Sequence, residues 1–251
     1  MLMFKVMMKN RKVLIISMLL GAVFGFFAYS HAASHIEWHA IATENGSLDL
    51  NDVLVTSFLH HDFDQFDYLW PNDSTILLSP IVFYLIGSLL GAHAFLRKNK
   101  GYYYFVYSRC QSHVQLVSKL LRGIGFPVLI YQVFYWGGLF VGMSTLESDF
   151  IAPMLTISIR ELVAFFIMRF LVLIFLVLVT FIVFIKKEAA IAMLVNTLTI
   201  ALILLTSIHV GIINLALFDE LSSMFISILV WIIINLAMYA LIKFGITYEL
   251  S

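Results

Sequence analysis

Six long runs of apolar residues dominate the chain, and polar or charged residues separate each run from the next. The runs cover residues 13–30, 75–96, 123–143, 160–185, 189–213 and 223–246. A helix needs about 20 mostly apolar residues to cross a hydrocarbon core of about 30 Å. Fixed charges interrupt the runs only at Arg160, Glu161, Arg169 and Lys243. The pattern therefore predicts an all-α, polytopic membrane helix bundle with six transmembrane helices.

The first run has a second interpretation, because a basic start, an apolar stretch and the small residues that follow it resemble a cleavable signal peptide. The apolar core of a signal peptide is about 7–15 residues long, and the uncharged stretch from Val13 to Tyr29 is longer. We therefore expect this run to be retained as the first transmembrane helix.

Composition supports a membrane protein. The chain is 62% hydrophobic and 12% charged, whereas soluble domains are about 45–50% apolar and about 25% charged. A single cysteine, Cys110, excludes an internal disulfide. No basic patch suited to nucleic acid, no phosphate-binding P-loop and no catalytic motif occurs in the sequence. We therefore expect a non-enzyme that carries no cofactor and binds no nucleic acid.

The lysines and arginines predict the orientation, since cytoplasmic loops of membrane proteins are rich in them. Of the 15, 13 lie before the first run, between the second and third, between the fourth and fifth, or at Lys243. The long loop at residues 31–73 has eight acids and no lysine or arginine. Both chain ends are thus predicted in the cytoplasm, with one long acidic loop outside. The whole chain, 1–251, forms one transmembrane domain with a basic leader at residues 1–12.

The cytoplasmic connector at residues 97–122 is basic and long for a link between neighbouring spans. Beyond Ser108, its apolar residues recur at near-helical spacing. The connector is therefore predicted to contain a surface helix at the inner leaflet, which then turns into the third span. Attraction to anionic membrane lipid is one sufficient reason for such a helix. Docking of a cytoplasmic partner is the other.

The connector contains the sequences YSRCQSH at 107–113 and SKLL at 118–121. They resemble the cytoplasmic segment between helices two and three in permeases of type 2 ABC exporters, which often contains Ser-Arg-Pro-x-Ser-Arg followed by Lys-apolar. The positions that match are Ser108, Arg109, Ser112 and Lys119. Cys110 replaces the usual proline and His113 the usual second arginine. The layout, with six spans and a sizeable first outer loop, also looks like that of small permeases from Firmicutes.

In that family, the segment forms a coupling helix that docks in an ATPase subunit. The resemblance therefore implies three partners: a cytoplasmic ATPase that binds ATP, a second permease copy or related chain, and the lipid of a bacterial cytoplasmic membrane. It also implies export of a hydrophobic or amphipathic substrate such as a peptide, an antibiotic or a lipid-like molecule. Ser108, Arg109, Ser112, His113 and Lys119 are the expected coupling residues.

The acidic outer loop suggests an alternative function. Its eight carboxylates suit a cationic peptide, so the chain is alternatively a non-transporting immunity or sensor protein. His31, His35 and His39 would share one face of a helix that continues from the first span, and imidazole is a common metal ligand. Histidines that occur by chance in an acidic, solvated loop are the simpler interpretation.

One charge is predicted deep in the bilayer. Arg169 lies well inside the fourth run, where an exposed charge is costly, so it must face the bundle, an aqueous cavity or a partner subunit. It is either a substrate or gating contact, or a donor that joins helices. Two small-x-x-x-small pairs, Gly21 with Gly25 and Gly87 with Gly91, predict close helix approach within the chain or across a dimer.

Overall fold

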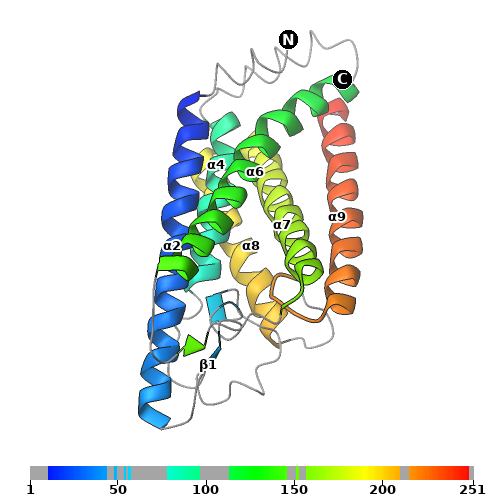
Figure 1. The fold of residues 1–251 in the computed structure, drawn as a ribbon. Helices are drawn as coiled ribbons and strands as arrows, with labels where there is room; N and C mark the ends of the chain where they lie inside the picture. Colours follow the sequence, from blue (N-terminus) through cyan, green and yellow to red (C-terminus); the bar gives the residue numbers. More distant parts are fainter. Residues whose placement is uncertain are drawn as a thin grey trace.

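The computed structural model describes residues 11–43, 48–49, 54, 56–57, 78–96, 113–145, 151–152, 157–209 and 215–248. Six helices occur among them: α2 (Arg11–Thr43), α4 (Leu78–Leu96), α6 (His113–Thr145), α7 (Ile159–Lys186), α8 (Ala189–His209) and α9 (Leu221–Tyr248). Successive helices run in opposite directions, so α2 begins and α9 ends at the same end of the bundle (Figure 1).

Each of the six apolar runs coincides with one of these helices. Five of them, α2, α6, α7, α8 and α9, are long and apolar enough to cross a membrane. The sixth, α4, has 19 residues and is a shorter apolar helix. The prediction of an all-helical bundle is confirmed, and five of its helices have the length and hydropathy that a membrane span requires.

Two expected boundaries were wrong. Helix α2 continues to Thr43, so the segment predicted as a loop at residues 31–73 begins as a helix. Alanines favour the helix there, and Ala32 and Ala33 are buried. At the other end, residues 113–122 belong to α6 itself and not to a separate surface helix. Neither Gly123 nor Gly125 ends the helix, because the apolar sequence on both sides continues its pattern.

Helix α7 is the centre of the bundle. It contacts α4, α6, α8 and α9, while α2 lies on the outside and packs mainly on α6. Twelve α7 side chains are buried, from Ala164 to Phe184. Helix α6 crosses the bundle diagonally, from the end of α9 to α2 (Figure 1). Pro127 lies inside α6 and removes one backbone hydrogen bond, which permits the curvature of this helix.

Glycines bring α2 and α6 into backbone contact. A Cβ atom at Gly21 would overlap the carbonyl oxygen of Tyr131, and one at Gly25 would overlap that of Tyr135. From the opposite side, Gly138 of α6 lies against the α2 backbone. The close approach predicted from Gly21 and Gly25 is therefore made within the chain.

The glycines of α4 receive side chains instead of backbone. A Cβ at Gly87 would lie 2.7 Å from Leu173 Cδ2, and one at Gly91 would lie 2.6 Å from Val177 Cγ2. Leucine and valine side chains of α7 thus fill the space that the glycines leave. This second pair also packs within the chain.

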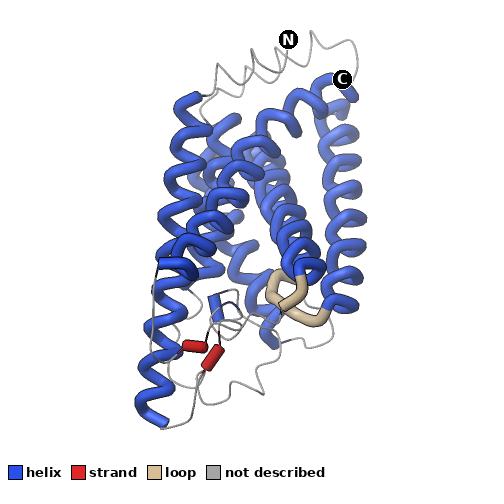
Figure 2. Tube along the Cα trace, in the orientation of Figure 1, coloured by secondary structure: helices blue, strands red, loops and turns tan. Residues whose placement is uncertain are grey.

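A short two-stranded sheet lies at the end of the bundle where α2 ends (Figure 2). Strand β1 (Leu48–Asp49) pairs in parallel with β2 (Ile151–Ala152), with Leu48 opposite Ile151 (Figure 2). Near β1 in the sequence, Leu54 and Ser57 are buried, and the Ser57 carbonyl accepts a hydrogen bond from the Ser79 hydroxyl of α4 at 3.3 Å. The described part of the connection between α2 and α4 is therefore packed on the bundle.

The glycine contact between α2 and α6 yields a stability prediction. Gly25→Ala is expected to lower the free energy of unfolding by about 1–3 kcal/mol, because the backbone of α6 has to move away. The control is Gly137→Ala, since a Cβ there has nothing within 4 Å and the helix gains up to about 1 kcal/mol in propensity. Thermal unfolding in mild detergent measures both, and equal midpoints for the two variants would contradict the contact.

Candidate functional site

The side chain of Arg169 points into the bundle, which is one of the three environments expected from its position in an apolar run. It lies ten residues after the start of α7 and is 1% exposed. With a rise of about 1.5 Å per residue, Arg169 lies about 15 Å along the helix axis from the first residue of α7. If α7 crosses the membrane, this is close to the middle of the hydrocarbon core.

Four aromatic rings surround the guanidinium group. Its central carbon lies 3.4 Å from the ring centroid of Phe83, 5.2 Å from Tyr135, 5.3 Å from Phe165 and 5.5 Å from Tyr84. We call these four residues the aromatic cage. The cage comes from three helices, because Phe83 and Tyr84 are on α4, Tyr135 is on α6 and Phe165 is one turn before Arg169 on α7.

The cage offsets part of the cost of the buried charge. An arginine at the bilayer centre costs about 2.5–3.5 kcal/mol on insertion scales. A cation over an aromatic face gains about 0.5–2 kcal/mol, and the gain is largest where water is excluded. The guanidinium also interacts with the Tyr84 side chain. The rings therefore permit a charge that lipid alone would not accept.

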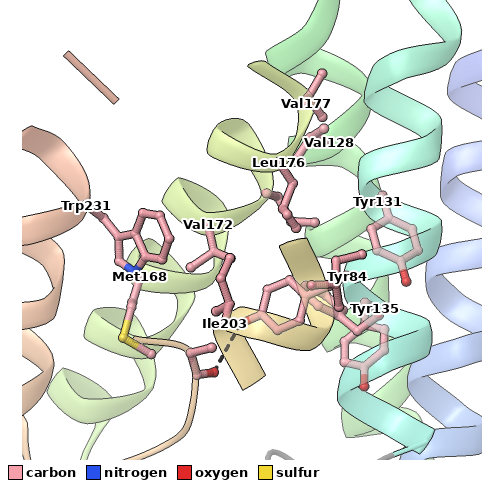
Figure 3. Packing of buried hydrophobic residues seen from close by; sticks show 14 of the residues in the cluster. Tyr84, Val128, Tyr131, Tyr135, Met168, Val172, Leu176, Val177, Ile203 and Trp231 are labelled. Carbon is pink, nitrogen blue, oxygen red and sulfur yellow. Dashed lines mark hydrogen bonds between the residues drawn. The ribbon is translucent and has the colours of Figure 1, made fainter. Parts of the chain in front are cut away.

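Tyr84 ties the cage to the connection that precedes α9. Its hydroxyl donates to the carbonyl oxygen of Ala216 at 3.1 Å, and Trp231 Nε1 of α9 donates to the carbonyl of Leu215 at 2.7 Å. Figure 3 shows Tyr84, Tyr131 and Tyr135 on one side of α7 and Trp231 on the other. The segment before α9 thus joins both sides of α7.

Two further polar residues on α6 lie next to the cage. Gln132 Nε2 donates to the Phe166 carbonyl of α7 at 2.6 Å. The ring of Tyr131 lies 5.5 Å from that of Phe83 and 6.2 Å from that of Tyr135. The hydroxyl of Tyr131 and Oε1 of Gln132 are buried without a hydrogen-bond partner. Buried polar atoms are rarely unsatisfied, which marks this as an unusual place in the bundle.

Sequence reasoning missed Tyr131 and Gln132 as part of this site. In the third apolar run, both residues stand out only as polar interruptions of the pattern. A sequence signal for the site was the spacing of Tyr131 and Tyr135, which are one turn apart and therefore place both rings on one face of a helix. Which helix that face would meet was not readable from the chain alone.

Other polar groups in the helices act as contacts between helices. Asn196 Nδ2 of α8 donates to Ser88 Oγ of α4 at 2.8 Å. Asn235 Nδ2 of α9 donates to the Leu171 carbonyl of α7 at 3.1 Å. Such hydrogen bonds are typical glue between membrane helices.

Glu161 has a local role at the start of α7. Its carboxylate accepts from the backbone N–H of Ser158 at 2.8 Å, and the Ser158 hydroxyl accepts from the backbone N–H of Glu161 at 3.3 Å. This reciprocal arrangement is a capping box. Arg160 and Ser158 are exposed there, as expected for an interface. The capping role, two turns before Arg169, explains why Glu161 belongs to the helix start and not to the cage.

The expected coupling residues lie at or before the start of α6. Ser108, Arg109 and Ser112 are outside the described residues, while His113 is the first residue of α6 and Lys119 lies in its second turn. The possible metal ligands His31, His35 and His39 all lie in α2, which extends to Thr43, as a shared helical face requires. Only the side chain of His31 is among the described residues. Within the described part of the chain, no group of three or more His, Cys, Asp or Glu side chains is placed to hold a metal ion.

Comparisons with protein-family models, with curated proteins and with solved structures give no match to this chain. The resemblance of residues 107–121 to type 2 exporter permeases therefore stays a hypothesis. Two structural features are relevant to this hypothesis: the arrangement of the helices and the residue at which α6 begins.

The cage predicts a specific energetic coupling. In a double-mutant cycle in detergent, Phe83→Leu and Arg169→Met should be non-additive by about 0.5–2 kcal/mol, because each removes one partner of the same contact. The control cycle combines Phe95→Leu with Arg169→Met. Phe95 is a buried residue of α4 whose ring packs on Phe181, and it is not part of the cage. Additive effects in the first cycle, or equal coupling in both, would contradict the contact.

Proposed function

We propose that the chain is the transmembrane permease subunit of an ATP-binding-cassette exporter and moves a hydrophobic or amphipathic substrate across a bacterial cytoplasmic membrane. A separate ATPase subunit supplies the hydrolysis. The observation that carries the proposal is the continuity of α6, which starts inside the motif-bearing connector at His113 and runs to Thr145 without a break.

A continuous α6 would connect the coupling residues to the interior of the bundle. Helix α6 contacts α2, α4 and α7, and it contributes Tyr135 to the aromatic cage. A partner that displaced the first turns of α6 would therefore move a ring beside Arg169. Pro127, between those turns and the cage, is a natural point for the helix to bend.

The orientation is part of the proposal. Arg11 and Lys12 begin α2, Lys186 is the last residue of α7 and Lys187 follows it, all at one end of the bundle. Asp219 and Glu220, at the other end, precede α9. Basic residues on the cytoplasmic side then place both chain ends inside. Helix α4, at about 1.5 Å per residue, is about 28 Å long and serves as the sixth span.

The first test is co-purification. The tagged protein, isolated from its native host in mild detergent, should carry a stoichiometric cytoplasmic ATPase that mass spectrometry identifies. Combining Arg109→Gln with Ser112→Ala should reduce the bound ATPase at least about tenfold, since charge-assisted contacts at an interface are lost. Lys186→Gln is the matched control, because it removes a basic residue at the same end of the bundle.

Reproducible purification of the wild-type protein without any ATPase would overturn the proposal. The function would then be that of the non-transporting protein that binds a cationic peptide through the acidic outer loop. Loss of the ATPase in the Lys186→Gln control would also contradict a specific role for residues 108–119.

Cys110 permits a test of the orientation, because it is the only cysteine in the chain. A membrane-impermeant maleimide should label Cys110 only after cells are permeabilised. The control carries Cys110→Ser with Ser222→Cys, at an exposed position in the first turn of α9, and should be labelled in intact cells. The reverse pattern would invert the topology.

A further inference from the structure

A permanent charge and a buried hydroxyl lie close to the aromatic cage, and they come from different helices. A guanidinium group has five N–H donors, accepts no hydrogen bond and stays charged at every physiological pH. The hydroxyl of Tyr131 is buried without a hydrogen-bond partner, and its ring centroid lies 5.5 Å from that of Phe83, the ring over which the guanidinium lies. Two side chains from different helices, Arg169 on α7 and Tyr131 on α6, thus bring donors to one buried place.

We propose that Arg169 and Tyr131 bind the anionic group of an amphipathic ligand, a carboxylate or a phosphate, and that the cage rings contact the adjoining apolar part. That this ligand is the transported substrate rests on the proposed function. The site itself requires only the bundle.

The charge selects the class of ligand. A cationic ligand is excluded because it would meet the guanidinium in a medium of low dielectric constant, where repulsion is strong. A neutral apolar ligand leaves the Tyr131 hydroxyl without an acceptor, which is costly for a buried donor. Carboxylates and phosphates match the fork of an arginine in two parallel hydrogen bonds.

Access needs a movement that the fold allows. Arg169 is closed off in this conformation, at 1% exposure. The rings that cover it come from α4, α6 and α7, so separation of α4 from α7 uncovers one side. Gly87 and Gly91 form much of that boundary, where they meet the ends of Leu173 and Val177. In this opened state, Phe83 gives up its contact with the guanidinium, and the anion replaces it.

The test measures binding to the purified full chain in nanodiscs of phosphatidylcholine, a lipid without net charge. The probe is radiolabelled dodecanoate below its micellar concentration, with dodecyl phosphate and dodecyltrimethylammonium as competitors. Saturable binding should be displaced by dodecyl phosphate and not by the cation. Absence of saturable binding, or displacement by the cation, overturns the proposal.

Variants locate the site. Arg169→Gln should weaken dodecanoate binding at least about tenfold and Tyr131→Phe about three- to tenfold, as expected for the loss of a charged and a neutral hydrogen bond. The matched control is Arg160→Gln, which removes an exposed arginine from the same helix and should bind as the wild type does. Unchanged affinity in Arg169→Gln, or an equal loss in Arg160→Gln, overturns the assignment. If Arg169→Gln does not fold, Tyr131→Phe decides alone, because it removes a single unpartnered hydroxyl.

A second arm identifies the source of the anion. Nanodiscs of phosphatidylglycerol that suppress dodecanoate binding point to a lipid headgroup in the site, and unaltered binding points to a free amphipathic acid. No ATPase is present in these measurements. If the protein binds the anion but no ATPase co-purifies with it, the export function is wrong and the anion site stands. If an ATPase co-purifies but the protein binds no anion, the anion site is wrong and the export function stands.

Discussion

Within a lipid bilayer, hydrophobicity does not hold helices such as these together, because lipid tails are as apolar as the side chains that meet between the helices. Their association depends on close packing and on the few polar groups inside. The chain supplies both. Glycines bring the α2 backbone onto α6, and amide and hydroxyl side chains connect α4 with α8 and α7 with α9. Every other feature of the structure, including the position of the buried charge, depends on these contacts.

Arg169 lies inside the bundle, where its side chain is closed off from solvent. Three helices meet around it, and each contributes aromatic rings to its surroundings. A structural contact at this depth needs only a small polar side chain, as Ser88 and Asn196 show. A permanent charge is a costly choice for the same task. The energetic cost of burying the guanidinium fits the proposal that it contacts a ligand in one conformation and aromatic rings in another.

Helix α6 connects the two parts of the molecule on which the functional proposals depend. Its first residue, His113, lies within the connector that resembles a coupling helix, and its middle holds Tyr131 and Tyr135 beside Arg169. The same helix carries the glycine contact with α2. Helix α6 therefore contacts both the cage and the outermost helix, α2.

The sequence by itself determined the positions of all six described helices, since a lipid environment demands long apolar runs. It also limited Arg169 to the bundle, an aqueous cavity or a partner subunit, because a charge exposed to lipid is costly. The length of α2 was not determined, since alanines favour a helix in lipid and in water alike. The continuity of α6 past Gly123 and Gly125 also escaped the pattern.

Only the tertiary structure decided what Arg169 meets. The rings of Phe83 and Tyr135 are separated from it by long stretches of chain, and no local periodicity specifies which apolar faces adjoin. It also decided that Gly21 and Gly25 pack on α6 and not on a second copy. In a chain that is apolar on nearly every helix face, hydropathy identifies the helices, and only shape and a few polar contacts select their neighbours.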